Sequence, residues 1–224
     1  MDLRLEGLIR GIYDGFVRPR LPWKISVHNG VAVRHRVKLL DNTDKFPQYE
    51  AELVSEIRAE VHEGDRVCVV GGGLGVSTVA AVEATGRKGS VKTYEGSEDQ
   101  IDIVKKTLEL NQVGSHVELR HGVVGSFSDF SSDFYGKAGS AAHIEAKDLP
   151  ESEVLVLDCE GAENEIIDGL ADLPPTIIVE SHGFLDSPES EVRQRLESRG
   201  YQIRNRAVEQ EKKGIVVLTA SKVD

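Results

Sequence analysis

The chain has 224 residues, of which 39% are hydrophobic and 29% are charged, enough for a core without disulfides or structural metals. Its 38 Asp and Glu residues outnumber 27 Lys and Arg residues, which gives a formal net charge of −11. Such a surface repels phosphate backbones and anionic lipid headgroups, so we expect neither nucleic-acid nor membrane binding. The two cysteines, Cys68 and Cys159, follow or lie within apolar runs, which favours a reduced, soluble, cytoplasmic protein.

The first 60 residues differ in pattern from the rest of the chain. Apolar residues between 5 and 16 fall on one face of a predicted helix, and residues 24–37 alternate around Asn29-Gly30, which predicts a hairpin. A further helix is expected over 48–61. We interpret 1–60 as a cap over a ligand cleft or a helical support beside it. Either its first helix or the hairpin expected at the C-terminal edge of the sheet could also pair two subunits into a homodimer.

From residue 64 onward, apolar strand-like runs alternate with segments of helical periodicity. Strands are predicted at 66–70, 90–95, 116–121, 154–157, 176–179, 201–206 and 214–219. Strands that alternate with helices and include nearly continuous apolar runs, such as 67–70 and 154–157, are typical of a parallel sheet covered on both faces. Because no helix separates the last two, we expect them to form an antiparallel hairpin at the sheet edge. The predicted fold of 61–224 is therefore α/β and Rossmann-like, a seven-stranded, mostly parallel sheet with an antiparallel terminal hairpin.

A glycine-rich loop follows the first strand of this sheet, and its glycines are Gly71, Gly72, Gly73 and Gly75. Glycines there let the backbone approach a ligand closely and point amide groups at an anion near a helix N-terminus. A dinucleotide fingerprint needs Gly or Ala where this chain has Val76, and the Gly-Lys-Ser/Thr of a nucleotidase loop is absent. The spacing fits a nucleoside cofactor that carries an amino-acid tail.

Glu95 ends the second strand, where a carboxylate can accept hydrogen bonds from both hydroxyls of a ribose. The loop amides and Glu95 are thus expected to hold opposite ends of one adenosine cofactor. Gly96 is a further expected cofactor-binding residue, and the adenine should lie near Val123 and Val124. The absent third glycine of the fingerprint and the terminal hairpin favour S-adenosylmethionine over NAD.

Acidic residues and a histidine follow the fourth and fifth strands, as Asp158-Cys159-Glu160-Gly161-Ala162-Glu163 and Glu180-Ser181-His182. With the glycine loop, these strings make residues 46 to 220 resemble the FkbM family of S-adenosylmethionine-dependent methyltransferases. The resemblance implies the seven-stranded methyltransferase sheet and methylation of oxygen on sugars or other small metabolites. The chain departs from the family at Val69, where an acidic residue is usual, and at Gly72-Gly73, where a small residue and Asn are usual.

Methyl transfer to a hydroxyl needs an aligned acceptor and a base. His182 is our candidate base, with Glu180 or Asp158 orienting it, because an imidazole titrates near neutrality. Asp158 and Glu160 could hydrogen-bond the acceptor or face the positive sulfonium, and Asp158 is also a candidate cofactor-binding residue. Alternatively, Asp158, Glu160 and His182 could hold a divalent ion, but their spacing resembles no metal motif, so we predict no metal. Glu163 is expected to interact with the dipole of the next helix.

The identity of the acceptor cannot be read from this chain beyond a small molecule or sugar. Trp23, Phe46 and Tyr49 of the cap either line the cleft or pack inside the cap. Two other function classes stay open: an NAD-dependent oxidoreductase on a similar sheet, against which Val76 argues, and a non-catalytic module derived from a methyltransferase.

Overall fold

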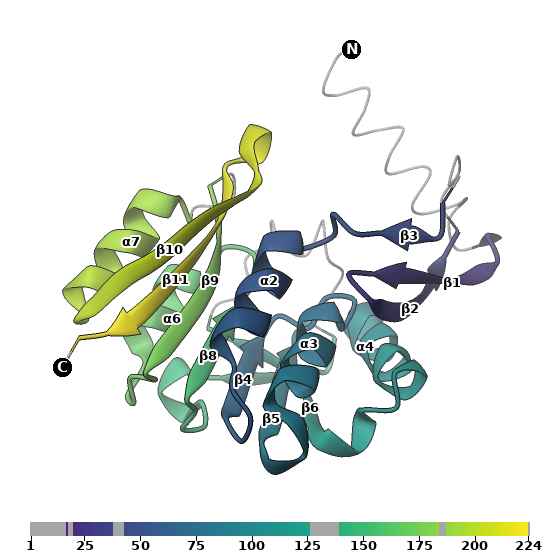
Figure 1. The fold of residues 1–224 in the computed structure, drawn as a ribbon, viewed down its shortest axis with the longest axis horizontal. Helices are drawn as coiled ribbons and strands as arrows, with labels where there is room; N and C mark the ends of the chain where they lie inside the picture. The colour runs from purple at the N-terminus through teal and green to yellow at the C-terminus, as the bar shows by residue number, and fades with distance from the viewer. Residues whose placement is uncertain (1–16, 18–19, 38–42, 126–138, 184–186, 224) are drawn as a thin grey trace.

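The computed structural model describes residues 17, 20–37, 43–125, 139–183 and 187–223 (Figure 1). A small sheet contains β1 (Trp23–His28), β2 (Val31–Arg36) and β3 (Lys45–Phe46). The large sheet contains β4 (Arg66–Val70), β5 (Ser90–Glu95), β6 (Val117–Val124), β7 (Ala142–Ile144), β8 (Val154–Leu157), β9 (Thr176–His182), β10 (Tyr201–Gln210) and β11 (Ile215–Lys222). The helices are α2 (Ala51–Glu60), α3 (Val76–Thr85), α4 (Glu98–Leu110), α6 (Glu163–Gly169) and α7 (Glu189–Ser198). Short 3₁₀ turns cover Gly86–Lys88, Gly114–His116, Ala146–Asp148 and Glu211–Lys213.

The large sheet has the strand order β10-β11-β9-β8-β4-β5-β6-β7. Neighbouring strands are parallel except β11, which runs antiparallel to both β9 and β10. All seven predicted strands are present, and the predicted Rossmann-like α/β fold with its antiparallel terminal hairpin is confirmed. An eighth strand, β7, adds three residues beside the end of β6. Three residues are too few to show the alternation of a strand, so the sequence did not predict it.

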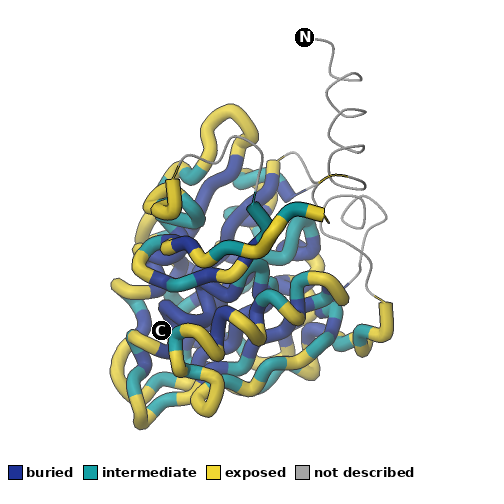
Figure 2. The backbone as a smooth tube through the Cα atoms, turned by 90° about the vertical axis from the view of Figure 1, so that its right-hand side faces the viewer, coloured by how far each residue is buried: buried dark blue, intermediate teal, exposed yellow. Residues whose placement is uncertain are grey.

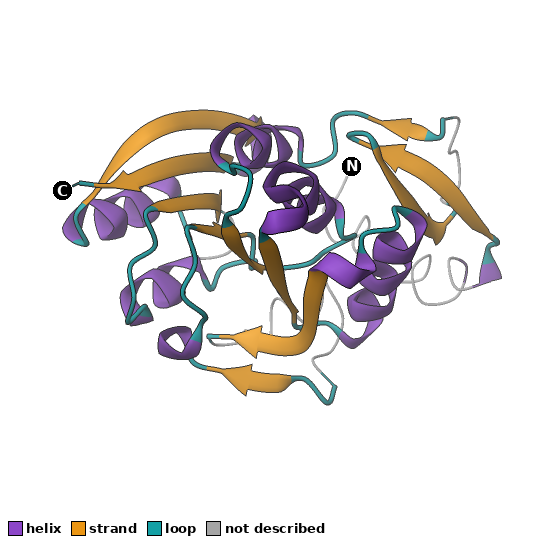
Figure 3. Ribbon diagram, turned by 60° about the horizontal axis from the view of Figure 1, so that its bottom comes forward, coloured by secondary structure: helices purple, strands orange, loops and turns teal. Residues whose placement is uncertain are grey.

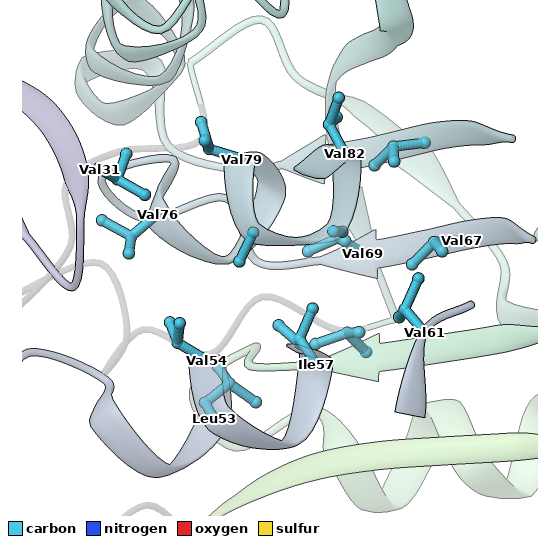
Figure 4. Packing of buried hydrophobic residues seen from close by; sticks show 14 of the residues in the cluster. Val31, Leu53, Val54, Ile57, Val61, Val67, Val69, Val76, Val79 and Val82 are labelled. Carbon is cyan, nitrogen blue, oxygen red and sulfur yellow. The ribbon is translucent and has the colours of Figure 1, made fainter. Parts of the chain in front are cut away.

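Helices cover both faces of the large sheet (Figures 1 and 3), and two cores follow from this arrangement. Val67 and Val69 of β4 join a cluster with apolar residues of α2, α3 and α4, part of which Figure 4 shows. Cys68 and Val70 of the same strand join a second cluster with residues of α6 and α7. Alternate side chains of one strand thus enter opposite cores, which is why the strand reads as a continuous apolar run. Figure 2 shows the resulting buried interior.

Four strands extend beyond their predicted ends, and two of these, β6 and β9, carry predicted site residues. β9 continues through His182, so Glu180 and His182 lie in a strand and the expectation that they follow it is wrong. The physical reason is the antiparallel neighbour: β11 pairs with β9 as far as His182, whereas the parallel pairing with β8 ends at Val179. β6 likewise continues to Val124, so the predicted adenine-binding valines end a strand instead of following one.

The small sheet confirms the predicted hairpin and attaches to the main body. Asn29 and Gly30, with φ of 48° and 90°, turn the chain from β1 into β2. The backbone N–H of Ala32 donates to Asn111 Oδ1 at 3.0 Å, and Asn111 Nδ2 donates to the Ala32 carbonyl at 2.8 Å, which ties β2 to the end of α4. The helix predicted at 5–16 lies outside the described residues.

The division at residue 60 and the homodimer stay predictions, although α2 packs on α3 and contacts β9 and β10 of the large sheet. No helix in the part of the chain that the structure describes is long and apolar enough to cross a membrane.

Candidate functional site

A cavity of about 310 Å³ opens at the carboxyl ends of the central parallel strands, where such sheets bind ligands. The loops after β4, β5 and β8 and the end of β6 line it, and the small sheet closes one side with residues of β1, β2 and β3. Its volume suits a small organic ligand. The described lining contains acidic and imidazole side chains but no Lys or Arg.

The glycine loop after β4 is held close to the loop after β8. Gly71 has φ of +96°, and a Cβ built on it would lie 1.7 Å from the carbonyl oxygen of Asp158, so only glycine fits there. The Gly71 N–H donates to the Tyr94 carbonyl at 3.0 Å, and the Asp158 N–H donates to the Val70 carbonyl at 2.9 Å. The loop after β4 and the loop after β8 are therefore in backbone contact beside the cavity.

The four predicted glycines have different positions. Gly71 and Gly73 line the cavity, whereas Gly72 and Gly75 are not part of its lining. Gly75 precedes α3 with φ of +85°, and a Cβ there would lie 3.1 Å from Thr107 Cβ, so this glycine allows α3 to pack closely on α4. The loop therefore combines ligand-facing backbone with helix packing.

Glu95 is buried at the end of β5 and binds the glycine loop directly. Its Oε2 accepts the N–H groups of Gly72 and Gly73, both at 2.9 Å, and its Oε1 accepts the Ser97 N–H at 2.7 Å. Burial raises the pKa of Glu95, and these three amide groups oppose that shift. The loop amides and Glu95 therefore contact each other, unlike the expected arrangement at opposite ends of a cofactor. A carboxylate has about four acceptor positions, so about one, on Oε1, is left for a ligand hydroxyl.

The remaining predicted cofactor residues lie around the same cavity. Gly96, Val123 and Val124 all line it, from the ends of β5 and β6. Val124 is 4% exposed, so the wall at this point is apolar and suits a flat ring.

The opposite end of the cavity is strongly acidic. Asp158 and Glu160 line it from the loop between β8 and α6, where Glu160 has a left-handed backbone with φ of 56°. Behind them, His182 Nε2 lies 3.5 Å from Asp158 Oδ1, 3.4 Å from Glu160 Oε2 and 3.4 Å from Glu180 Oε1. His182 Nδ1 lies 2.8 Å from Oε1 of Glu163, which is fully buried at the start of α6. The three predicted catalytic residues thus do come together.

His182 is 2% exposed and does not line the cavity. Burial lowers its pKa, but the hydrogen bond to Glu163 and the neighbouring carboxylates of Glu180 and Glu160 hold that pKa well above the usual value. Burial and the charges of Glu180 and Glu50 raise the pKa of Asp158, and burial raises the pKa of Glu50 to about 8. Because His182 is buried among carboxylates and does not reach the cavity, its role as a base stays a prediction that this geometry weighs against.

Comparison with solved structures identifies the architecture. Trm5b of Pyrococcus abyssi superposes with a TM-score of 0.57 at 11% identity, over 90% of this chain and 56% of Trm5b. SMU.776, a proposed methyltransferase solved in complex with S-adenosylhomocysteine, gives 0.57 at 12% identity, over 89% and 56% of the two chains. TrmK of B. subtilis, a tRNA methyltransferase, gives 0.51 at 14%, over 77% and 66%.

The fold is that of the class I methyltransferases. The chain spans little more than half the length of Trm5b and SMU.776. No family model matches the sequence, and no curated protein does.

In this methyltransferase fold the small sheet contributes cavity residues that the sequence did not predict. His28 and His35 line the cavity, and both imidazoles lie within hydrogen-bond distance of Ser26 Oγ, at 2.9 Å and 2.7 Å. In the sequence, only the positions of His28 and His35 on either side of a hairpin turn pointed to these residues. A hairpin pattern does not show which surface the hairpin will cover. Of the aromatic residues considered in the cap, Phe46 and Tyr49 line the cavity, whereas Trp23 is 43% exposed and outside its lining.

Proposed function

We propose that this chain transfers a methyl group from S-adenosylmethionine to a hydroxyl oxygen of a small acceptor such as a sugar, the chemistry associated with the FkbM-type strings at Asp158–Glu163 and Glu180–His182. The observation that carries the proposal is the cavity itself. In a class I methyltransferase fold it brings together the glycine loop, the Glu95 carboxylate and an acidic end.

The residues present fit this cofactor. Gly73 lines the cavity and has no side chain, so a ligand can approach the backbone of the loop closely there. The free acceptor position on Glu95 Oε1 suits one ribose hydroxyl, and the apolar wall at Val123 and Val124 suits the adenine. Bound there, the cofactor would supply an already activated methyl group on a positively charged sulfur.

The acidic end of the cavity suits that positive charge. Asp158, Glu160 and Glu50 line it, and no Lys or Arg does so among the described residues. The same residues disfavour a phosphorylated acceptor, because phosphate and carboxylate groups repel each other. This charge, together with the −11 of the whole chain, supports a neutral small acceptor over a nucleic acid, even though TrmK acts on tRNA.

Isothermal titration with S-adenosylhomocysteine tests the cofactor, with NADH as the parallel titrant. We expect one site with micromolar affinity for S-adenosylhomocysteine and no NADH binding. A matched control is Glu197→Ala, which removes a half-exposed carboxylate on α7 and should bind like the unmodified chain. NADH binding alone, or no binding of either compound, would overturn the proposal.

The acceptor is tested with methyl-labelled S-adenosylmethionine and two pools, a small-metabolite extract rich in sugars and total tRNA. Label in the small-metabolite pool is the expected result. Label only in tRNA would refute the acceptor class while leaving the cofactor assignment intact, and cofactor binding without transfer to either pool would favour the non-catalytic module.

A further inference from the structure

Three ligand-type atoms from two adjacent strand ends converge beside the cavity. One ligand atom each of Asp158, Glu160 and His182 lies within 4.8 Å of the other two. The two separations from the imidazole, 3.5 Å and 3.4 Å, exceed ordinary N–H···O hydrogen-bond distances. They match the edge of a tetrahedron around an ion with bonds of about 2.1 Å, which is about 3.4 Å.

The other ring nitrogen of His182 is held as a metal-binding histidine requires. Glu163 Oε1 lies 2.8 Å from Nδ1, and the Gly161 N–H donates to both Glu163 oxygens, at 3.2 Å and 3.0 Å. A fully buried carboxylate fixed in this way accepts the Nδ1 proton and orients the ring. A cation that displaces the Nε2 proton would then meet the Nε2 lone pair beside Asp158 and Glu160, as in the carboxylate–histidine–metal arrangement.

Glu180 supplies a second, independent observation. This residue is 5% exposed, its Oε1 lies 3.4 Å from His182 Nε2, and its Oε2 is buried without a hydrogen-bond partner among the described residues. A buried carboxylate oxygen that lacks a donor is costly, and a cation beside it removes that cost. Four carboxylates, those of Asp158, Glu160, Glu163 and Glu180, thus surround one imidazole.

We propose that Asp158, Glu160 and His182 bind a divalent cation at the acidic end of the cavity, with Glu180 beside it and Glu163 positioning the histidine. This replaces the expectation of no metal drawn from sequence spacing. One imidazole with two carboxylates favours Mn²⁺ or Zn²⁺ over Mg²⁺ and Ca²⁺, which prefer sites made only of oxygen.

The open side of the site faces the cavity, because Asp158 and Glu160 line it. A ligand oxygen entering the cavity could therefore complete the coordination of the ion. This extension rests on the proposed function: the acceptor would be a molecule whose hydroxyl binds the ion and loses its proton more easily there. The bound ion, instead of His182 acting as a base, would then activate the acceptor hydroxyl.

Metal binding is tested on the full chain after treatment with a chelator and removal of the chelator. Titration with MnCl₂ and with ZnCl₂, followed by calorimetry, should show one site. Asp158→Asn and Glu160→Gln should each weaken binding at least about tenfold, and Glu163→Gln should weaken it about tenfold or more through the orientation of the ring. Glu109→Gln, which changes an exposed carboxylate on α4, is the matched control and should leave binding unchanged.

Pulsed electron paramagnetic resonance of the Mn²⁺ form detects direct coordination by His182, which a purely structural role of this residue would not produce. Nitrogen modulation from a coordinated imidazole is expected in the unmodified chain and should be absent in His182→Gln. Because His182→Gln could fail to fold, Glu160→Gln, which changes a loop carboxylate, serves as the second variant. No binding of either ion, binding that Glu160→Gln leaves intact, or Mn²⁺ bound without nitrogen modulation would each overturn the proposal.

The two proposals fail separately. Titration of S-adenosylhomocysteine into metal-free and metal-loaded protein distinguishes them. Metal binding without S-adenosylhomocysteine binding would refute the methyltransferase function and leave the ion site standing. The reverse result would refute the ion site alone.

Discussion

Glu95 connects the stability of the glycine loop to cofactor binding, and its replacement separates the two. In Glu95→Gln the side-chain oxygen can keep the two glycine amides at 2.9 Å, but the new amide group then faces the Ser97 N–H, a donor opposite a donor. Loss of one charge-assisted hydrogen bond costs about 1.5–3 kcal/mol. Burying the charged carboxylate is itself unfavourable, as its raised pKa indicates, and Gln removes that cost. This gain offsets part of the lost hydrogen-bond energy. We therefore expect the free energy of unfolding to fall by about 1–2 kcal/mol.

Glu95→Ala removes the acceptor of all three amides. Water in the cavity can reach the Gly73 N–H, whereas Gly72 and Ser97 bond to Glu95 in buried surroundings, so the expected loss is larger, about 3 kcal/mol. Urea unfolding followed by circular dichroism measures both variants. If Glu95→Ala unfolds at the same urea concentration as the unmodified chain, the three hydrogen bonds do not hold the loop and the reasoning is refuted.

Titration of the same two variants with S-adenosylhomocysteine measures how much Glu95 contributes to cofactor affinity. One hydroxyl hydrogen bond to Glu95 Oε1 predicts about tenfold weaker binding in Glu95→Gln, since 1.4 kcal/mol corresponds to a factor of ten. Lower stability with unchanged affinity in Glu95→Gln would show that Glu95 serves the loop only.

Two further predictions follow from glycine geometry and from a buried carboxyl group. Gly71 and Gly64 have φ of +96° and +99°, but a Cβ on Gly71 would lie 1.7 Å from the Asp158 carbonyl whereas one on Gly64 meets nothing within 4 Å. Gly64→Ala should cost about 1–2 kcal/mol through backbone strain, and Gly71→Ala more, with loss of S-adenosylhomocysteine binding; equal costs would contradict the packing argument. For Glu50, a pKa of about 8 in the folded chain means that the folded state binds more protons between about pH 4.5 and pH 8. With a chelator present, stability should therefore fall as pH rises through that range, by at most about 1.4 kcal/mol per unit, and Glu50→Gln should flatten the slope in pH-dependent unfolding.

Much of the architecture is set by residues close together in the chain, so it could be predicted from the sequence. Runs such as 67–70 and 154–157 are apolar at every position because both faces of a parallel sheet are buried, and Asn29-Gly30 supplies the backbone angles of a tight turn. The absence of a helix between the last two strands sufficed to predict an antiparallel hairpin. The short β7 and the extension of β9 to His182 escaped prediction, because each depends on a neighbouring strand that continues to offer hydrogen-bond partners.

The site divides in the same way. Which side chains follow each strand can be read along the chain, so Gly71, Glu95, Asp158 and His182 were all found from sequence. Their contacts were decided by tertiary structure: Glu95 reaches the loop amides, and His182 is buried against Glu163 instead of facing the cavity. Side-chain pairing across a fold depends on distances between segments remote in sequence, and burial then sets the charge that each group carries. Spacing along one chain contains neither quantity.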